Sequence, residues 1–319
     1  MRFAIIIPAF NCENYIAEAI ASALEQRQRD LEVIVVDDGS TDRTLAKVEA
    51  IKDPRLMVLS QPNSGVMTAR RAGFELCKAD AVVFLDGDDR LQPNTVSRYE
   101  ACFSASPNVG LIYGSRVLID QLGQPIGRRQ RGFLNPQPNG WALERMLTRN
   151  FISTIGQTCI RSDCLRGSEA LKSTVRRAVD WVLYCEIACS SEFLSLPGHS
   201  VVQYRVYGGS MARRLADSGT HATDISDVLP AIDEIYALAG VARRFTKSDL
   251  VRLRTSTRGS AFAWKGQELL RARRWSAARK CFLKAIRDSH HKDLRDLLCL
   301  ALTLIRFFPP GTRGFIGVP

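Results

Sequence analysis

The sequence has no long apolar segment and no recognisable export signal. No run of 18 or more uncharged apolar residues occurs in the 319 residues, so no transmembrane helix is predicted. The apolar start, MRFAIIIPAF, is too short for a signal peptide and is expected to form a first strand. With 45% hydrophobic and 24% charged residues, the chain is expected to be globular, with two domains or one large domain and an appendage.

The sequence also lacks the common motifs for zinc and for nucleotide phosphates. The nine cysteines are scattered, and the closest pairs, Cys159/Cys164 and Cys185/Cys189, form no double CxxC array. We therefore expect reduced, mostly buried thiols. The four histidines show no ligand spacing. No GxGxxG follows the first apolar run and no GxxxxGKS/T occurs, which disfavours dinucleotide and P-loop sites.

The positive charge is concentrated in the last quarter of the chain. The net charge is +11, and residues 241–319 carry 18 Lys and Arg against 5 Asp and Glu. Residues 1–240 carry 26 against 28, so the two regions are expected to have different functions. The basic region lacks interleaved aromatic residues and any known nucleic-acid module, and we expect no nucleic-acid partner.

Apolar strands alternate with helical patterns at the start of the chain. Strands are predicted at 3–7, 31–36, 56–59 and 81–85, with helices at 15–24, 41–51 and 68–77. This order predicts a parallel sheet covered on both faces, in which ligands bind beyond the carboxyl ends of the strands. Three polar clusters follow such strands and are expected to meet at one crevice: Pro8–Glu13, Asp37–Ser40 and Asp86–Asp89.

The later part of the chain has a different pattern. We expect a strand at 111–119, a loop at 121–140, a helix at 141–149, a strand at 156–160, a helix at 179–188 and a strand at 201–206. From about residue 217 to 308 the pattern is helical, with a break near Gly240. The segment 266–286 resembles a helical hairpin of the tetratricopeptide kind.

Two acidic sites, the Asp86–Asp89 cluster and Asp180, allow a structural and a chemical interpretation. Asp86, Asp88 and Asp89 end an apolar strand, and such carboxylates can bind a hard divalent cation together with substrate phosphates. They could equally form an acidic turn that caps a following helix. Asp180 precedes a helical pattern and is either a helix cap or a general base. From these residues alone, both questions stay open.

Five segments in this order resemble family 2 glycosyltransferases of the GT-A fold: IIIPAFNCENYIAEAIASALEQ, EVIVVDDGSTDRT, NSGVMTARRAGFELCKADAVVFLDGDD, VDWVLYCEIA and QYRVYGGSM. The similarity covers about residues 3–215. It implies an α/β protein with a Rossmann-like, mostly parallel sheet and a C-terminal helical appendage. It also implies a nucleotide-sugar-binding half at 1–110, an acceptor-binding half at 111–215 and a basic helical region at 216–319.

The resemblance implies inverting transfer of a sugar from a nucleoside diphosphate-sugar, usually a UDP-sugar, with Mn²⁺ or Mg²⁺. Asp86 and Asp88 match the DxD pair; Asp88 is the first choice for the metal, and Asp86 alternatively contacts the ribose or sugar. Asp89 matches the acidic residue after the pair. Asp180 matches the catalytic base, although Val179 stands where the family usually has an acidic residue.

The other matching positions are implied to bind the nucleotide-sugar. Asp38 matches the residue that contacts the base, and Arg70 matches a basic residue near the phosphates, with Arg71 an alternative by proximity. Arg205 is expected either to contact the diphosphate or to form a surface salt bridge. Tyr207 stands where the family often has His, so a role for that His is unsupported here. Matches to the first nucleotide-binding turn are Pro8, Ala9 and Glu13.

Family breadth suggests a cytosol-facing enzyme of surface polysaccharide or glycoconjugate assembly, with a saccharide or lipid-linked saccharide as acceptor. One alternative is a polyprenyl-phosphate glycosyltransferase, which needs no base and is therefore disfavoured by Asp180. Another is a catalytically silent binding module. Leu294–Phe308 is apolar but too short to span a bilayer. It is expected either to lie on the inner face of the plasma membrane or to form a domain or homodimer interface.

Overall fold

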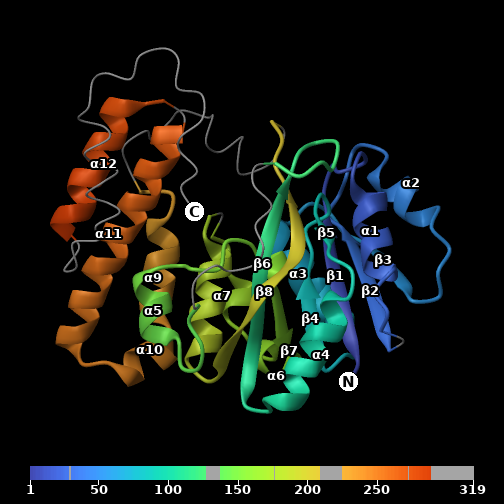
Figure 1. Ribbon diagram of the computed structural model, residues 1–319, viewed down its shortest axis with the longest axis horizontal. Helices are drawn as coiled ribbons and strands as arrows, with labels where there is room; N and C mark the ends of the chain where they lie inside the picture. The colour runs from blue at the N-terminus through green and yellow to red at the C-terminus, as the bar shows by residue number, and fades with distance from the viewer. Residues whose placement is uncertain (29, 127–136, 176, 209–224, 272, 289–319) are drawn as a thin grey trace.

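The computed structural model describes residues 1–28, 30–126, 137–175, 177–208, 225–271 and 273–288, and its centre is one eight-stranded sheet (Figure 1). The strand order is β3-β2-β1-β4-β7-β6-β8-β5. The pairs β3/β2, β2/β1, β1/β4 and β6/β8 are parallel, whereas the pairs of β7 and of β5 are antiparallel. The strands are β1 (Phe3–Ala9), β2 (Leu31–Asp37), β3 (Leu56–Ser60), β4 (Ala81–Phe84), β5 (Arg90–Leu91), β6 (Val109–Ile119), β7 (Thr158–Arg161) and β8 (Glu192–Arg205).

The central strands are buried on both faces, as their unbroken apolar sequences predict. Every residue of β1 and β2 is buried. Successive side chains of a strand point to opposite faces, so Ile6 joins one core and Ile5 and Ile7 join the other. Two hydrophobic cores therefore hold the sheet between two helical layers.

Helices cover both faces of the sheet. On one face lie α1 (Ile16–Leu24), α2 (Thr44–Glu49) and α4 (Thr95–Ala105). The other face is covered by α3 (Val66–Leu76), α5 (Leu143–Thr148) and α7 (Val179–Ala188), the last with the bounds expected from the sequence. Short helical turns are η1 (Ile155–Gln157), α6 (Ser162–Leu165) and η2 (Ala170–Lys172).

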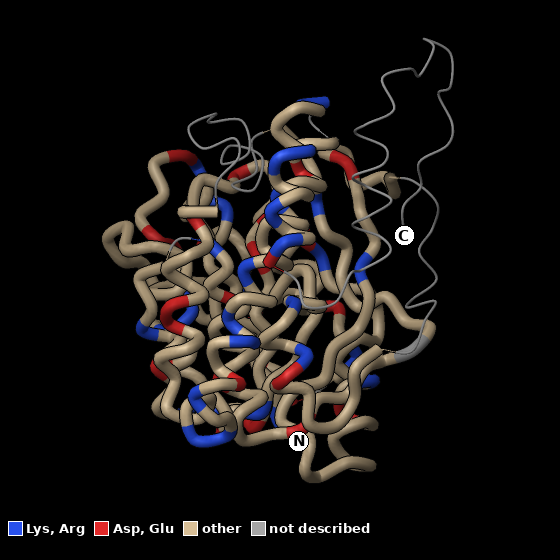
Figure 2. Tube along the Cα trace, turned by 90° about the vertical axis from the view of Figure 1, so that its left-hand side faces the viewer, with Lys and Arg blue, Asp and Glu red and all other residues tan. Residues whose placement is uncertain are grey.

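The C-terminal helices pack on α5 and α7 and turn away from the sheet (Figure 1), and Figure 2 views the molecule from their side. They are α9 (Leu229–Ala237), α10 (Ala239–Arg244), α11 (Lys247–Arg271) and α12 (Trp275–Asp288), of which α11 and α12 form the expected hairpin. Phe262 and Phe282 belong to the same core as Phe84 of β4. The helical region is thus continuous with the core of the sheet.

Two sequence expectations differ from the structure in detail, and two expected segments are not described. The helical break lies at the extended residue Leu238, whereas Gly240 is inside α10 and allows close contact with Cys189. Strand β8 begins at Glu192 rather than near 201, because it pairs along β6 through several register shifts. The segments 217–224 and Leu294–Phe308 lie outside the described residues. Within the described part, no helix is long and apolar enough to cross a membrane.

Candidate functional site

The polar clusters at the ends of β1, β2 and β4 lie beside one another, as the sheet order requires. The Asp38 backbone N–H donates to the Ala9 carbonyl at 2.8 Å. A Cβ added at Gly87 would lie 3.2 Å from the Pro8 carbonyl oxygen. The predicted meeting of these clusters is therefore confirmed. Since β1 joins β2 and β4 in parallel, the carboxyl ends of all three strands open at one edge.

Arg70, on α3, connects two of the predicted site carboxylates. Its Nη2 atom lies 2.8 Å from Asp86 Oδ1, and its Nη1 atom lies 2.8 Å from Asp180 Oδ1. The Arg70 side chain is 4% exposed, whereas the two carboxylates are about one-third exposed at 32% and 28%. Although burial opposes the charge, Asp180 and Asp86 together hold the pKa of Arg70 above its usual range. A buried cation thus joins the DxD strand end to Asp180.

Asp180 lies in the first turn of α7, and it is not the helix cap. Ala178 occupies the N-cap position, in a left-handed conformation with φ of 57°. Burial raises the pKa of Asp180, an effect that Arg70 partly offsets and Asp86 adds to. The arrangement gives Asp180 a proton affinity above that of an ordinary aspartate, as a general base requires.

Asp88 interacts with Tyr207, the residue that stands where the resembling family often has His. Burial and the nearby Asp86 charge raise the pKa of Asp88 to about 6, and the hydrogen bond from the Tyr207 hydroxyl opposes this rise. The Tyr207 ring also lies 5.0 Å from the ring of Tyr15, measured between centroids. Tyr207 therefore supports Asp88 from one side.

Asp89 and Arg205 form a buried support beneath the DxD turn. The Arg205 backbone N–H donates to Asp89 Oδ1 at 2.8 Å, and its Nε donates to the Asp88 carbonyl at 2.8 Å. Its Nη2 atom lies 2.8 Å from Glu18 Oε2, and the guanidinium stacks over the Tyr15 ring at 4.4 Å. The Arg205 side chain is fully buried, so its visible role is to fix the turn. Contact with a diphosphate remains a prediction for Arg205.

Asp38 and Glu13 also make contacts within the protein. The Asp38 carboxylate accepts hydrogen bonds from the Ser64 and Gly65 backbone N–H groups, both at 2.9 Å, and from Gln61 Nε2 at 2.7 Å. Asp38 thereby holds the loop before α3 against β2. Glu13 Oε2 accepts from Arg43 Nε at 3.1 Å. The nucleotide contacts of both residues, and of Pro8 and Ala9, remain predictions.

The carboxylates of the DxD turn fit a divalent cation that substrate phosphates complete. Among the described residues, no three His, Cys, Asp or Glu side chains are arranged to hold a metal alone. Mg²⁺ and Mn²⁺ are bound by oxygen, however, often from one or two carboxylates plus phosphate. Asp86 and Asp88 supply such oxygens. Asp89 Oδ2 is buried and, within the described part, accepts no hydrogen bond. Asn94, not an aspartate, is the N-cap of α4, so these carboxylates do not cap that helix.

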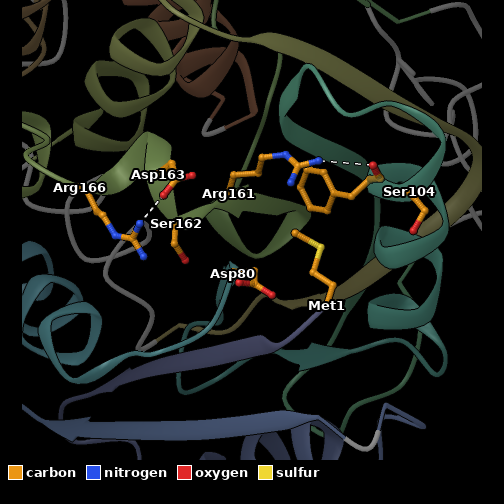
Figure 3. A pocket seen from close by; sticks show the side chains of 8 residues that line it. Met1, Asp80, Ser104, Arg161, Ser162, Asp163 and Arg166 are labelled. Atoms are coloured by element: carbon orange, nitrogen blue, oxygen red, sulfur yellow. Dashed lines mark hydrogen bonds and ion pairs between the residues drawn. The ribbon is translucent and has the colours of Figure 1, made fainter.

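A separate pocket lies at the opposite edge of the sheet (Figure 3). Its wall includes Met1 before β1, Asp80 before β4, and Arg161 at the end of the antiparallel β7. Arg161 stacks on Phe103 and donates to the Val109 carbonyl, so its charged group is used within the fold. The pocket takes no part in the carboxylate site.

Glu18 and Tyr15, which contact Arg205, were not predicted from the sequence. Arg70 contacts the Asp86 and Asp180 carboxylates, and its predicted contact with the phosphates remains a prediction. Glu18 and Tyr15 lie in or beside α1, within the first segment that carries the family resemblance. No local pattern marks them, since their partner Arg205 is 187 residues away from Glu18.

The chain is similar to several characterised proteins. It is 29% identical to chondroitin synthase of Pasteurella multocida over 194 residues, covering 60% of this chain and 19% of that protein. It therefore spans about a fifth of the length of that relative. It is 28% identical over 262 residues to the succinoglycan biosynthesis protein ExoO of Rhizobium meliloti, covering 75% and 70% of the two chains.

The fold matches a crystal structure of S. aureus TarS 1–349 in complex with UDP-GlcNAc. The TM-score is 0.62 at 16% identity, and the match covers 94% of this chain and 84% of that one. This likeness confirms the expected GT-A architecture. Residues 4–166 match the family described as Glycosyl transferase family 2, which confirms the resemblance in the sequence. The chain belongs to glycosyl transferase family 2.

Proposed function

We propose that this protein transfers a sugar from a nucleoside diphosphate-sugar, most simply a UDP-sugar, to an acceptor hydroxyl with inversion. The observation that carries the proposal is the Arg70 bridge between Asp86 and Asp180. Asp86 belongs to the strand end whose carboxylates could hold the cation of a diphosphate, and Asp180 is a carboxylate with a raised pKa. Direct displacement requires that the donor site and the base are held in a fixed arrangement. The buried Arg70 guanidinium contacts a carboxylate of each.

On the donor side, the protein residues hold the nucleotide-sugar at the ends of β1, β2 and β4. Asp88, with Asp86 or Asp89, would hold Mn²⁺ or Mg²⁺, which supplies Lewis-acid stabilisation of the leaving diphosphate. Arg205 keeps the turn that carries these carboxylates fixed, through its bonds to Asp88 and Asp89. A cation held by such fixed carboxylates would stabilise the negative charge of the leaving diphosphate without reorganising during the reaction.

On the acceptor side, Asp180 takes the proton of the attacking hydroxyl. Its position at the start of α7 is set by Arg70, which leaves 28% of the Asp180 side chain exposed. General-base catalysis contributes roughly 10²–10⁴-fold to a rate. A polyprenyl-phosphate acceptor is already ionised and needs no such base, so Asp180 favours a hydroxyl acceptor.

The named relatives suggest the biological setting. Chondroitin synthase and a succinoglycan biosynthesis protein are among them, so we propose a saccharide or lipid-linked saccharide acceptor in surface polysaccharide assembly. The active site then faces the cytosol, where nucleotide-sugars are made. A silent binding module is the alternative of another class, and the intact Asp86, Asp88 and Asp180 set argues against it.

The test is a panel of nucleotide-sugars, with thermal stabilisation and turnover measured with Mn²⁺, with Mg²⁺ and with EDTA. Asp88→Ala is expected to abolish turnover and to weaken metal-dependent donor binding, because it removes the first-choice metal ligand. Asp163→Ala, an exposed carboxylate on α6, serves as the control. A protein that binds donors without turnover would be a silent module. Turnover unaffected by both EDTA and Asp88→Ala would contradict the metal role.

We also propose that the outer face of α12 contacts an anionic membrane surface. Trp275, Arg279, Leu283 and Arg287 are spaced by four residues and are all exposed, with Trp275 and Leu283 at 45% and 49%. No Asp or Glu occurs between Glu268 and Asp288. Exposed aromatic and aliphatic side chains among cations suit the interface of an anionic bilayer, where each nearby cation contributes about 1 kcal/mol.

A further inference from the structure

Arg177 connects the segment before α7 to the C-terminal helical region. Its Nη1 atom lies 2.6 Å from Asp227 Oδ2, and its Nη2 atom lies 3.3 Å from Glu268 Oε1 on α11. The guanidinium also stacks over the Trp264 ring at 4.8 Å. The Arg177 side chain is 11% exposed, so these contacts fix it from three directions.

Lys265 completes the charge cluster around Arg177. Its Nζ atom lies 3.6 Å from Glu268 Oε2 and 3.9 Å from Asp227 Oδ2. Two cations and two anions therefore share a largely buried site between α11 and the segment before α9. Each depends on the others, because removing one partner of a buried ion pair leaves an uncompensated charge.

A second connection runs from α7 to α11 through the end of α5. Trp181, next to Asp180, donates its Nε1–H to the Met146 carbonyl at 2.7 Å. Thr257 on α11 donates its hydroxyl to the adjacent Leu147 carbonyl at 2.7 Å. Figure 1 shows α5 and α9 between α7 and the α11–α12 hairpin. The start of α7 is thus tied to α11 by two independent routes.

Ala178, which lies between Arg177 and Asp180 in the chain, has an unfavourable backbone conformation. Ala178 has φ of 57°, a left-handed value that a non-glycine residue holds only where its surroundings enforce it. Arg177 precedes Ala178 directly, and Trp181 follows Asp180. Contacts that lead to the helical region, directly or through α5, therefore lie on both sides of Asp180 in the chain.

We propose that the C-terminal helical region positions Asp180, with Arg177 as the positioning residue that transmits its effect. This inference rests on the proposed role of Asp180 as the base. It assigns a function to a region that lies beyond the family match at residues 4–166. Arg177 touches neither donor nor acceptor in this scheme; it acts through the position of the α7 start.

The test compares Arg177→Gln with Arg254→Gln. Arg254 joins α11 to α9 through an exposed pair with Asp233, whereas Arg177 joins the segment before α7 to α11. We expect Arg177→Gln to lower kcat by about 10-fold or more, because a small misplacement of a reacting group costs that much. Its donor KM should stay within about two-fold, since uniform binding is unchanged. Arg254→Gln should match the unsubstituted protein, and Arg177→Lys, which keeps the charge, should recover part of kcat.

Amide hydrogen exchange of residues 178–182 provides a readout that does not need activity. We expect faster exchange there in Arg177→Gln than in Arg254→Gln, and Glu268→Gln, a milder change, should show the same trend even if Arg177→Gln does not fold. Equal exchange in the variants, or faster exchange with unchanged kcat, would overturn the positioning role. Absence of any transferase activity in the unsubstituted protein would instead refute the proposed function. The exchange measurement would then still test whether Arg177 holds the start of α7 in place.

Discussion

At the scale of single residues, the site depends on one buried arginine shared by two carboxylates. Arg70 Nη atoms reach Asp86 and Asp180 at 2.8 Å each. A guanidinium is suited to this task because its planar group presents several donors in fixed directions. A lysine at position 70 would carry the charge but could not hold both carboxylates in the same geometry.

Replacing Asp180 with Asn tests the base directly. We expect turnover to fall by about 10²-fold or more while donor affinity, measured by calorimetry, stays nearly unchanged. Asp163→Asn, on an exposed surface pair, is the matched control and should behave as the unsubstituted protein.

The pH dependence of turnover reports on Asp180 together with Asp88, because the pKa values of both carboxylates are raised. Because burial raises the pKa of Asp180, activity should be lost on acidification at a pH above the ordinary aspartate value of about 3.9. The base is active only when deprotonated, so the rate falls as pH falls through that pKa. If Asp180→Asn keeps turnover near the original value, Asp180 serves only as an ion-pair partner of Arg70.

At the scale of elements, the position of Arg70 depends on how closely α3 approaches the sheet. A Cβ at Gly73 would lie 2.5 Å from Ile6 Cγ2 and 3.1 Å from Val36 Cγ2. Gly73 is one turn after Arg70 in the same helix. Its missing side chain therefore lets α3 pack against β1 and β2, at the depth from which Arg70 reaches Asp86 after β4 and Asp180 on α7.

Gly73→Ala should destabilise the protein by a net amount of about 1–2 kcal/mol, because overpacking outweighs the better helix propensity of alanine. Urea denaturation measures the change, and Glu75→Ala, at an exposed position of the same helix, should alter the free energy of unfolding by less than about 0.5 kcal/mol. An alanine variant as stable as the original would show that α3 can move away from the sheet without cost.

At the scale of the whole molecule, one continuous core joins the sheet to the helical region, while the charge is divided between them. Phe84 of β4 and Phe282 of α12 belong to the same core. The acidic strand ends lie in the sheet, and the outer face of α12 carries the exposed Arg279 and Arg287. Docking through that face would confine the protein to a membrane surface, where a lipid-linked acceptor is found.

Vesicle co-sedimentation tests this docking. Binding to phosphatidylglycerol vesicles is expected at low salt and should weaken at high salt, where exposed charges are screened. Arg279→Gln combined with Lys280→Gln should reduce binding. Lys52→Gln should not, because this exposed residue follows α2, which lies on the opposite side of the molecule from α12 (Figure 1). No binding at low salt, together with a stable dimer lost on deleting residues 290–319, would show that the region is a protein interface.

Local patterns in the sequence determined the α/β order, the α7 bounds and the three polar strand ends, because buried parallel strands and amphipathic helices are encoded by residues close together in the chain. The three polar ends lie close together because the strands that carry them are parallel neighbours in the sheet. Tertiary structure decided the partners of the charged groups. Arg70 contacts Asp180, which is 110 residues away in the sequence, and Arg177 contacts Glu268, which is 91 residues away. Such contacts leave no local periodicity, since burial and geometry select one partner among many carboxylates only after the helices have packed.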